Sequence, residues 1–91
     1  MKGIDNMTKM YAYTADHFTY FSTLSDERTV TTTITARIFC NKAQVATLSF
    51  TGTAKCHRYD TFDYTIGVTI STLRAEQALY NYIVDKNINQ F

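Results

Sequence analysis

Two consecutive segments in the middle of the chain alternate between apolar and polar residues, and this alternation limits the fold more than any other feature. In residues 29–40, Val30, Ile34 and Ile38 share one side and threonines occupy most of the other. Residues 45–56 repeat the pattern, with Leu48 and Phe50 on the apolar side. A period of two places successive side chains on opposite faces of a β-strand. We therefore predict two half-buried strands over residues 29–40 and 45–56.

The short connection between these strands predicts an antiparallel hairpin, and the alternation restricts its register. Directly opposed residues point to the same face, so the loop must contain an odd number of residues. A three-residue loop over residues 42–44 satisfies this condition. The resulting pairs are Ile38 with Leu48, Ala36 with Phe50, Ile34 with Gly52, Val30 with Cys56, Thr35 with Thr51, and Thr33 with Thr53. The threonine pairs form a ladder on the outer face, and Cys40 and Cys56 lie at opposite ends of the hairpin, too far apart to bridge.

Residues 10–22 precede the hairpin and are rich in aromatic and β-forming side chains, which favours a third strand. Aromatic residues occupy both odd and even positions of this segment, so we expect a bulge near Asp16 and His17.

A helix is predicted after the hairpin, over residues 61–86, with Asp60 as its N-cap and Asp63 in its first turn. Projected at 100° per residue, this helix has two apolar stripes on roughly opposite sides. One stripe consists of Ile66, Ile70, Leu73, Tyr80 and Val84. The other consists of Val68, Ala75, Leu79, Tyr82 and Ile83.

Together these elements predict a single domain over residues 1–91 of the α+β class. A three-stranded antiparallel sheet, ordered as a meander, is followed by one long C-terminal helix packed on one face. Such a two-layer fold buries only one side of its helix. We expect the second stripe, from Val68 to Ile83, to be covered by a partner, and a symmetric homodimer is the commonest arrangement. The alternative is that the N-terminal segment folds over it.

Charge and hydropathy exclude several classes of protein. The formal net charge is +1, which is too balanced for a strong electrostatic nucleic-acid binder. No apolar run approaches the roughly 20 residues that span a bilayer, and the N-terminus lacks the apolar region of a signal peptide. We therefore expect no membrane association and a cytoplasmic location, in the host cytosol if the protein is encoded by a phage.

No pattern of reactive residues indicates an enzyme, a metal or another cofactor. His17, Cys40, Cys56 and His57 are the soft metal ligands, and none has the spacing of a zinc site. Cys56 and His57 have no third residue to orient them for nucleophilic catalysis. Helix capping explains Asp60 and Asp63, and close packing of the helix on the sheet explains Gly52 and Gly67 better than a phosphate loop does.

The residues Gly52-Thr-Ala54-Lys55-Cys56, Asp60-Thr-Phe62-Asp63 and Leu73-Arg74-Ala75 resemble a pattern in small phage and bacterial proteins of unknown function. The resemblance covers residues 30–79, with Arg58 where the pattern has proline. Some proteins of this class have a fold like the double-stranded RNA-binding domain, with three antiparallel strands against a C-terminal helix. The resemblance thus implies the same fold and an origin in a phage, and it implies no mechanism.

The absence of chemistry and the doubly apolar helix favour a non-enzymatic protein-binding module. If the resemblance holds, the partner is a host factor, and the protein inhibits host defence in the manner of an anti-CRISPR protein. The alternative is a small nucleic-acid-binding accessory protein. In that case Lys55, Arg58 and Arg74 are the candidate contacts.

Overall fold

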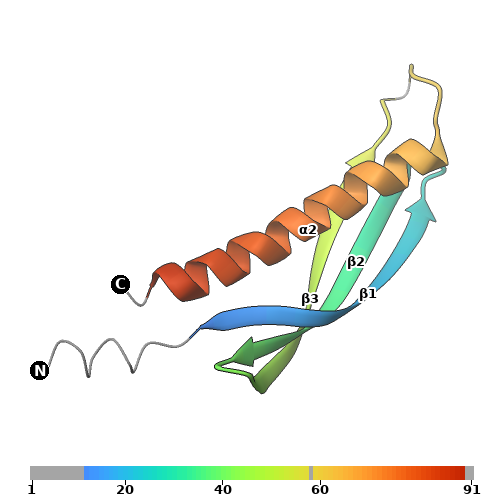
Figure 1. Cartoon of the computed structure of the whole chain (residues 1–91). Helices are drawn as coiled ribbons and strands as arrows, with labels where there is room; N and C mark the ends of the chain where they lie inside the picture. The colour runs from blue at the N-terminus through green and yellow to red at the C-terminus, as the bar shows by residue number, and fades with distance from the viewer. Residues whose placement is uncertain (1–11, 58, 90–91) are drawn as a thin grey trace, which may run out of the picture.

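The computed structural model describes residues 12–57 and 59–89, which form three strands and one helix. The strands are β1 (Tyr13–Ser25), β2 (Thr29–Cys40) and β3 (Ala43–Lys55), and the helix is α2 (Tyr64–Ile88). The sheet is an antiparallel meander in the order β1-β2-β3, and α2 lies diagonally across one face (Figure 1). The helix packs mainly on β3 and β2. The predicted α+β class and topology are confirmed.

The alternation in the sequence places one face of β2 in the core. Val30, Thr32, Ile34, Ala36 and Ile38 are each fully buried beneath the helix. The bounds predicted for this strand agree with the structure, whereas β3 begins and ends earlier than predicted. The limits of a central strand are predicted best from a period of two, because it pairs with a strand on each side along its length.

The register of the β2–β3 hairpin differs from the prediction by two residues. Ile38 pairs with Ala46, Ile34 pairs with Phe50, and Gly52 pairs with Thr32 instead of Ile34. The connection is a two-residue turn at Asn41 and Lys42, whose φ values of 52° and 72° suit the right-handed twist of a hairpin. A bulge opposite Ile38 and Phe39 adds one residue to β3. The two-residue turn and this extra residue together have the same effect as a three-residue loop: apolar residues of both strands still point to the same face.

The outer face of the sheet is the predicted threonine ladder, with partners shifted by the same two residues. Thr33 lies opposite Thr51, and Thr31 opposite Thr53. Hydroxyl groups are within hydrogen-bond distance across the strands, at 3.3 Å between Thr31 Oγ1 and Thr53 Oγ1 and 2.9 Å between Thr35 Oγ1 and Ser49 Oγ.

The predicted bulge in β1 is confirmed. The pairing of β1 with β2 is interrupted between Asp16 and Thr19, and His17 has a φ of 56°. The extra residue exchanges the faces of the odd-numbered and even-numbered positions of β1. This explains why aromatic residues occur at both odd and even positions. The strand runs to Ser25, beyond the predicted end at residue 22, and the predicted start at residue 10 lies outside the described residues.

The helix begins at Tyr64, three residues later than predicted, and its N-cap is Asp63 rather than Asp60. Asp63 has an extended backbone, and its Oδ1 accepts a hydrogen bond of 3.1 Å from the Ile66 N–H. Asp60 lies in the preceding loop, where its carbonyl oxygen accepts a hydrogen bond of 2.9 Å from Arg28 Nη1. Asp63 therefore satisfies the free N–H group at the helix start, and Asp60 belongs to the anchor of the loop.

Small residues bring α2 close to the sheet. A Cβ atom at Gly52 would collide with the Ser71 carbonyl oxygen and the Ala75 backbone nitrogen, and one at Gly67 would lie 2.7 Å from Val30 Cγ2. The prediction that both glycines serve close packing is confirmed. Under this contact, Thr32 Oγ1 and Ser71 Oγ share a fully buried hydrogen bond of 2.7 Å. Across residues 12–57 and 59–89, no helix has the length and hydropathy needed to cross a membrane.

Candidate protein-binding surface

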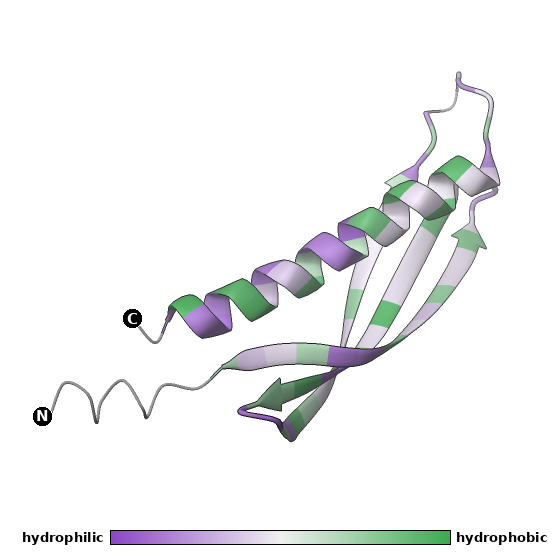
Figure 2. Ribbon diagram, viewed as in Figure 1, coloured by the Kyte–Doolittle hydropathy of each residue, from purple (hydrophilic) through white to green (hydrophobic). Residues whose placement is uncertain are grey.

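The side of α2 that faces away from the sheet carries a row of large apolar side chains, which we name the outer stripe. Each of these side chains is between 38% and 60% exposed. The outer stripe consists of Ile66, Ile70, Leu73, Tyr80, Val84 and Ile88. Hydrophobic segments recur along the free side of the helix in Figure 2. Single exposed apolar residues are common on proteins, but a row of six on one side of a helix marks an interaction surface.

The sheet-facing side of α2 has the opposite size pattern. Its fully or nearly fully buried residues are Gly67, Ser71, Ala75 and Leu79, and three of these four are small. Large side chains cannot fit there, because the backbone of β3 approaches the helix at Gly52. Where β3 comes close, between Gly67 and Ala75, the helix therefore places small residues against the sheet and large residues outside.

The structure corrects the predicted interface, because the two stripes exchange the roles predicted for them from the sequence. Ala75 and Leu79 belong to the core cluster, Tyr82 and Ile83 pack against it, and Val68 is half-buried. The Tyr82 ring lies 5.6 Å from the Phe50 ring, centroid to centroid. One signal in the sequence distinguishes the two sides: Gly67, Ser71 and Ala75 repeat every four residues, as the close-packed side of a helix requires.

Polar residues flank the outer stripe on both sides of α2. On the β3 side, Arg74 Nη1 donates a hydrogen bond of 2.6 Å to the Thr53 carbonyl oxygen. On the β1 side, Glu76 Oε2 accepts one of 3.1 Å from the Tyr20 hydroxyl. Partial burial raises the pKa of Tyr20 above its usual value, and the bond to Glu76 and its negative charge raise it further. Arg74 and Glu76, on opposite flanks of the stripe, therefore carry opposite charges.

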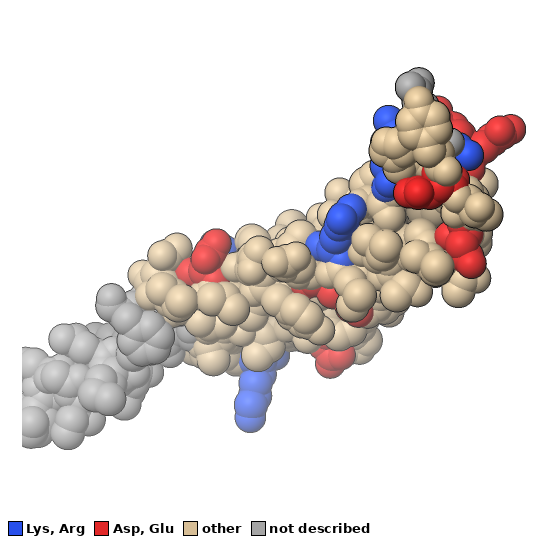
Figure 3. Space-filling view, turned by 90° about the horizontal axis from the view of Figure 1, so that it is seen from above, with Lys and Arg blue, Asp and Glu red and all other residues tan. Residues whose placement is uncertain are grey.

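The predicted nucleic-acid contacts do not form one patch in the described part of the chain. Lys55 follows Thr53 and Thr51 on the outer face of the sheet, whereas Arg74 is on α2, on the other face. Arg58 lies outside the described residues. Figure 3 shows Lys and Arg mixed with Asp and Glu near the start of α2, and a mostly uncharged surface along the helix.

The residues considered for catalysis lie near one another, but they do not contact one another as a nucleophile and a base would. Cys56, His57, Asp60 and Asp63 line a cavity of about 370 Å³ at the start of α2. The His57 ring is turned toward Tyr59, whose N–H donates to His57 Nδ1 at 3.3 Å, and Cys56 Sγ contacts the His57 carbonyl oxygen instead. This geometry lacks the hydrogen bond between nucleophile and base that nucleophilic catalysis requires.

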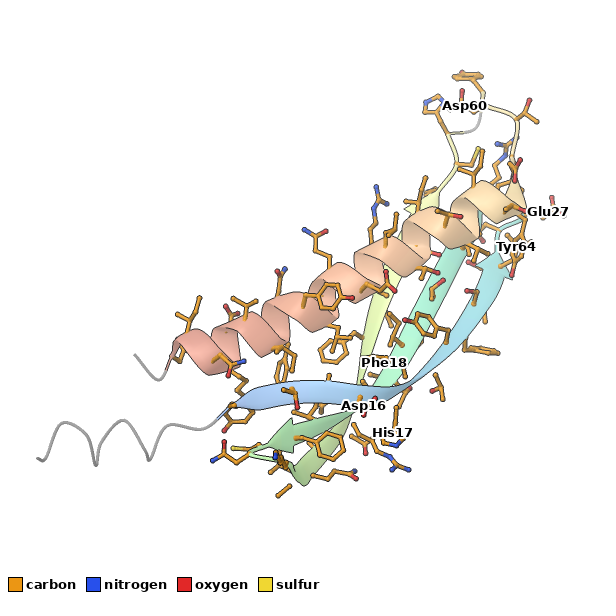
Figure 4. All side chains as sticks on the ribbon, viewed as in Figure 1. Asp16, His17, Phe18, Glu27, Asp60 and Tyr64 are labelled. Carbon is orange, nitrogen blue, oxygen red and sulfur yellow. The ribbon has the colours of Figure 1, made fainter. Side chains whose placement is uncertain are left out.

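The candidate metal ligands do not assemble in the described residues. His17 is at the β1 bulge, far along the sheet from Asp60 in the loop before α2 (Figure 4). Cys40 ends β2, at the opposite end of the hairpin from Cys56. Among residues 12–57 and 59–89, no group of three His, Cys, Asp or Glu side chains is placed to hold a metal ion.

Comparison with known proteins gives no significant match to a protein-family model, a curated protein or a solved structure. The assignment of a function therefore depends on the surface of this chain.

Proposed function

We propose that the protein is a non-enzymatic protein-binding module and that the outer stripe of α2 is its recognition surface. The observation that carries the proposal is the row of six large apolar side chains exposed along one side of a 25-residue helix. Interface cores are depleted of charge and rich in aromatic and aliphatic anchors. The outer stripe has this composition, and polar residues border it as they border an interface core.

The core of this chain does not need these side chains. Ile34, Ile38, Ala75 and Leu79 are buried between helix and sheet, whereas each residue of the outer stripe leaves at least 38% of its surface exposed. Exposed apolar area favours association, at about 25 cal/mol for each Å² removed from water. A binding partner is the simplest reason for a helix to carry large apolar residues on its solvent side.

A factor of a host defence system is a narrower hypothesis for the partner. It depends on the resemblance of the sequence to small phage proteins, and not on a residue of the surface. The nucleic-acid alternative has no specific observation in its favour within the described residues, because Lys55 and Arg74 lie on different faces and Arg74 is engaged by Thr53.

Site-specific photo-crosslinking tests the proposal. A photoreactive amino acid is placed at Leu73, on the outer stripe, or at Thr51, on the outer face of the sheet, in cells that naturally contain the chain. We expect a discrete protein adduct from position 73 and none from position 51, because only the first position touches the partner. Equal adducts from both positions, or none from either, would contradict the proposal.

A further inference from the structure

The outward positions of α2 have the spacing of a helix that packs against another helix. They follow one another at steps of four, three, four, three and four residues, and none is charged. These positions are Ile66, Ile70, Leu73, Gln77, Tyr80 and Val84. Steps of three and four are the heptad pattern, which keeps one seam facing a partner helix. We infer that a second copy of this chain packs its α2 in parallel along the outer stripe. This inference depends on the proposed function, because it names the partner of the same surface.

The residue types at the seam favour a pair of helices. In heptad notation, Ile70, Gln77 and Val84 occupy the a positions, and Ile66, Leu73 and Tyr80 occupy the d positions, with leucine at the central one. β-Branched residues at a combined with leucine at d favour two-stranded coiled coils over larger bundles. The centre of the seam, where Leu73 is the d residue, therefore favours one partner helix, and a second copy supplies the same residues.

Gln77 is the feature that points to an identical copy. It is exposed between Leu73 and Tyr80, in the middle of an otherwise apolar seam. A polar residue at a single a position costs stability and specifies the register and the number of helices. Across a two-fold axis, the amide of Gln77 meets the same amide, and each group supplies the donor that the other accepts. A purely apolar partner would leave this amide without a hydrogen bond.

The charges beside the seam favour the parallel orientation. Arg74 lies on the flank near β3 and Glu76 on the flank near β1, as their hydrogen bonds to Thr53 and Tyr20 show. In a parallel pair, the Arg74 flank of one copy faces the Glu76 flank of the other, on both sides of the axis. The two residues are about 3 Å apart along the helix axis. An antiparallel pair centred on this region brings Arg74 to Arg74 and Glu76 to Glu76, and like charges oppose association.

The sheet makes a short seam sufficient. An isolated coiled coil needs about three or four heptads, because association must also hold the helix together. Here α2 is already held against β2 and β3, and its outer stripe is directly opposite the buried Ala75. Two copies then form four layers, with the sheets outside and the two helices inside.

A membrane surface fits the outer stripe less well than a second copy does. Helices that lie on membranes carry Lys and Arg on their polar flanks to bind anionic lipids. The charged residues of α2 are Arg74 and Lys86 together with Glu76 and Asp85, so the helix has no excess of basic residues with which to bind such lipids.

Sedimentation equilibrium on the purified full chain tests the inference. At micromolar concentrations we expect twice the chain mass of 10.4 kDa for the wild type and for Thr51→Glu, the matched control on the far face of the sheet. Leu73→Glu should have the mass of one chain, because two carboxylates would meet in an apolar seam. A single-chain mass for the wild type, or a dimer unchanged by Leu73→Glu, would overturn the inference. Coverage of the stripe by the N-terminal segment would give the first of these results.

Disulfide trapping tests the orientation. In a Cys40→Ser and Cys56→Ser background, Ile66→Cys and Val84→Cys are each oxidised alone and then as a mixture. A parallel pair brings each position to its own copy, so each variant should link to itself. Linkage only in the mixture indicates an antiparallel pair and overturns the inference.

The two proposals fail in different ways. A monomeric wild-type chain that still forms a crosslink from position 73 to another protein would overturn the second copy as the partner and support the proposed function. A monomeric chain without any crosslink from that position would overturn both.

Discussion

Individual small residues set the distance between α2 and the sheet. Gly52 on β3 faces the backbone of the helix at Ser71 and Ala75, and Gly67 on the helix faces Val30 on β2. At both places the neighbouring atoms fill the space of a methyl group, but at Gly52 they belong to backbone and at Gly67 to a side chain. Backbone atoms can move less easily, so the two glycines differ in how well they tolerate replacement.

Gly52→Ala should therefore reduce the free energy of unfolding by about 2 to 3 kcal/mol, because the helix must move away from the sheet. Gly67→Ala should cost less, since the atom in closest contact belongs to the Val30 side chain and not to backbone, and alanine improves the helix by about 1 kcal/mol. Urea unfolding followed by circular dichroism, at one fixed protein concentration, measures both. A Gly52→Ala protein as stable as the wild type would show that the contact is looser than described.

The buried hydroxyls of Thr32 and Ser71 form a second critical contact at the scale of single residues. Thr32 Oγ1 is 2.7 Å from both Ser71 Oγ and Ser22 Oγ, and every described buried side-chain polar atom has a hydrogen-bond partner. Thr32→Val keeps the shape and removes the hydroxyl, so it should cost about 1 kcal/mol or slightly more.

A double-mutant cycle with Ser71→Ala tests this network. Ser71→Ala should cost less in the Thr32→Val background than in the wild type, because its partner is already absent. Strictly additive losses in the unfolding free energy would indicate that the two hydroxyls act independently.

At the scale of elements, the sequence predicted the existence and order of the strands and the helix better than their exact limits. Alternation defined β2 fully, because that strand has a neighbour on both sides. Alternation left the register of the β2–β3 hairpin open, since a three-residue loop and a two-residue turn with a bulge both keep the apolar residues on one face. The start of α2 was ambiguous for a similar reason: Asp60 and Asp63 are both suitable N-caps, and only the anchoring of the loop by Arg28 decides between them.

The N-cap assignment gives a prediction at this scale. Asp63→Ala should lower the unfolding free energy by about 1 kcal/mol, because the Ile66 N–H loses its acceptor. Asp60→Ala should change it by less than about 0.5 kcal/mol, since Asp60 contributes its carbonyl oxygen to the loop. Thermal unfolding of the two variants distinguishes them, and a larger loss for Asp60→Ala would restore the cap predicted from the sequence.

The binding surface could be predicted from the sequence only in part. Periodicity showed two apolar stripes on α2, but hydrophobicity does not tell which one faces the sheet, because both contain aliphatic and aromatic residues. Side-chain volume is what separates them: the sheet side must be small where Gly52 approaches, and the outer stripe has no such limit. Volume depends on the distance between helix and sheet, which the folded structure fixes.

At the scale of the whole molecule, α2 has two apolar sides, and among residues 12–57 and 59–89 the sheet packs against one of them. The sheet covers the side of Ala75 and Leu79, and the outer stripe stays exposed. The two sides can therefore be altered separately. Replacing Leu73, which is 60% exposed, by glutamate should leave the unfolding free energy of the monomeric fold nearly unchanged while it disrupts binding.

The apparent mass of the protein in extracts of cells that naturally contain it is the measurement that tests this account most directly. We predict that the wild type and Thr51→Glu elute from size exclusion in a complex larger than a single chain, and that Leu73→Glu elutes as a single folded chain. Elution of all three as single chains, or a complex that Leu73→Glu leaves intact, would contradict the account.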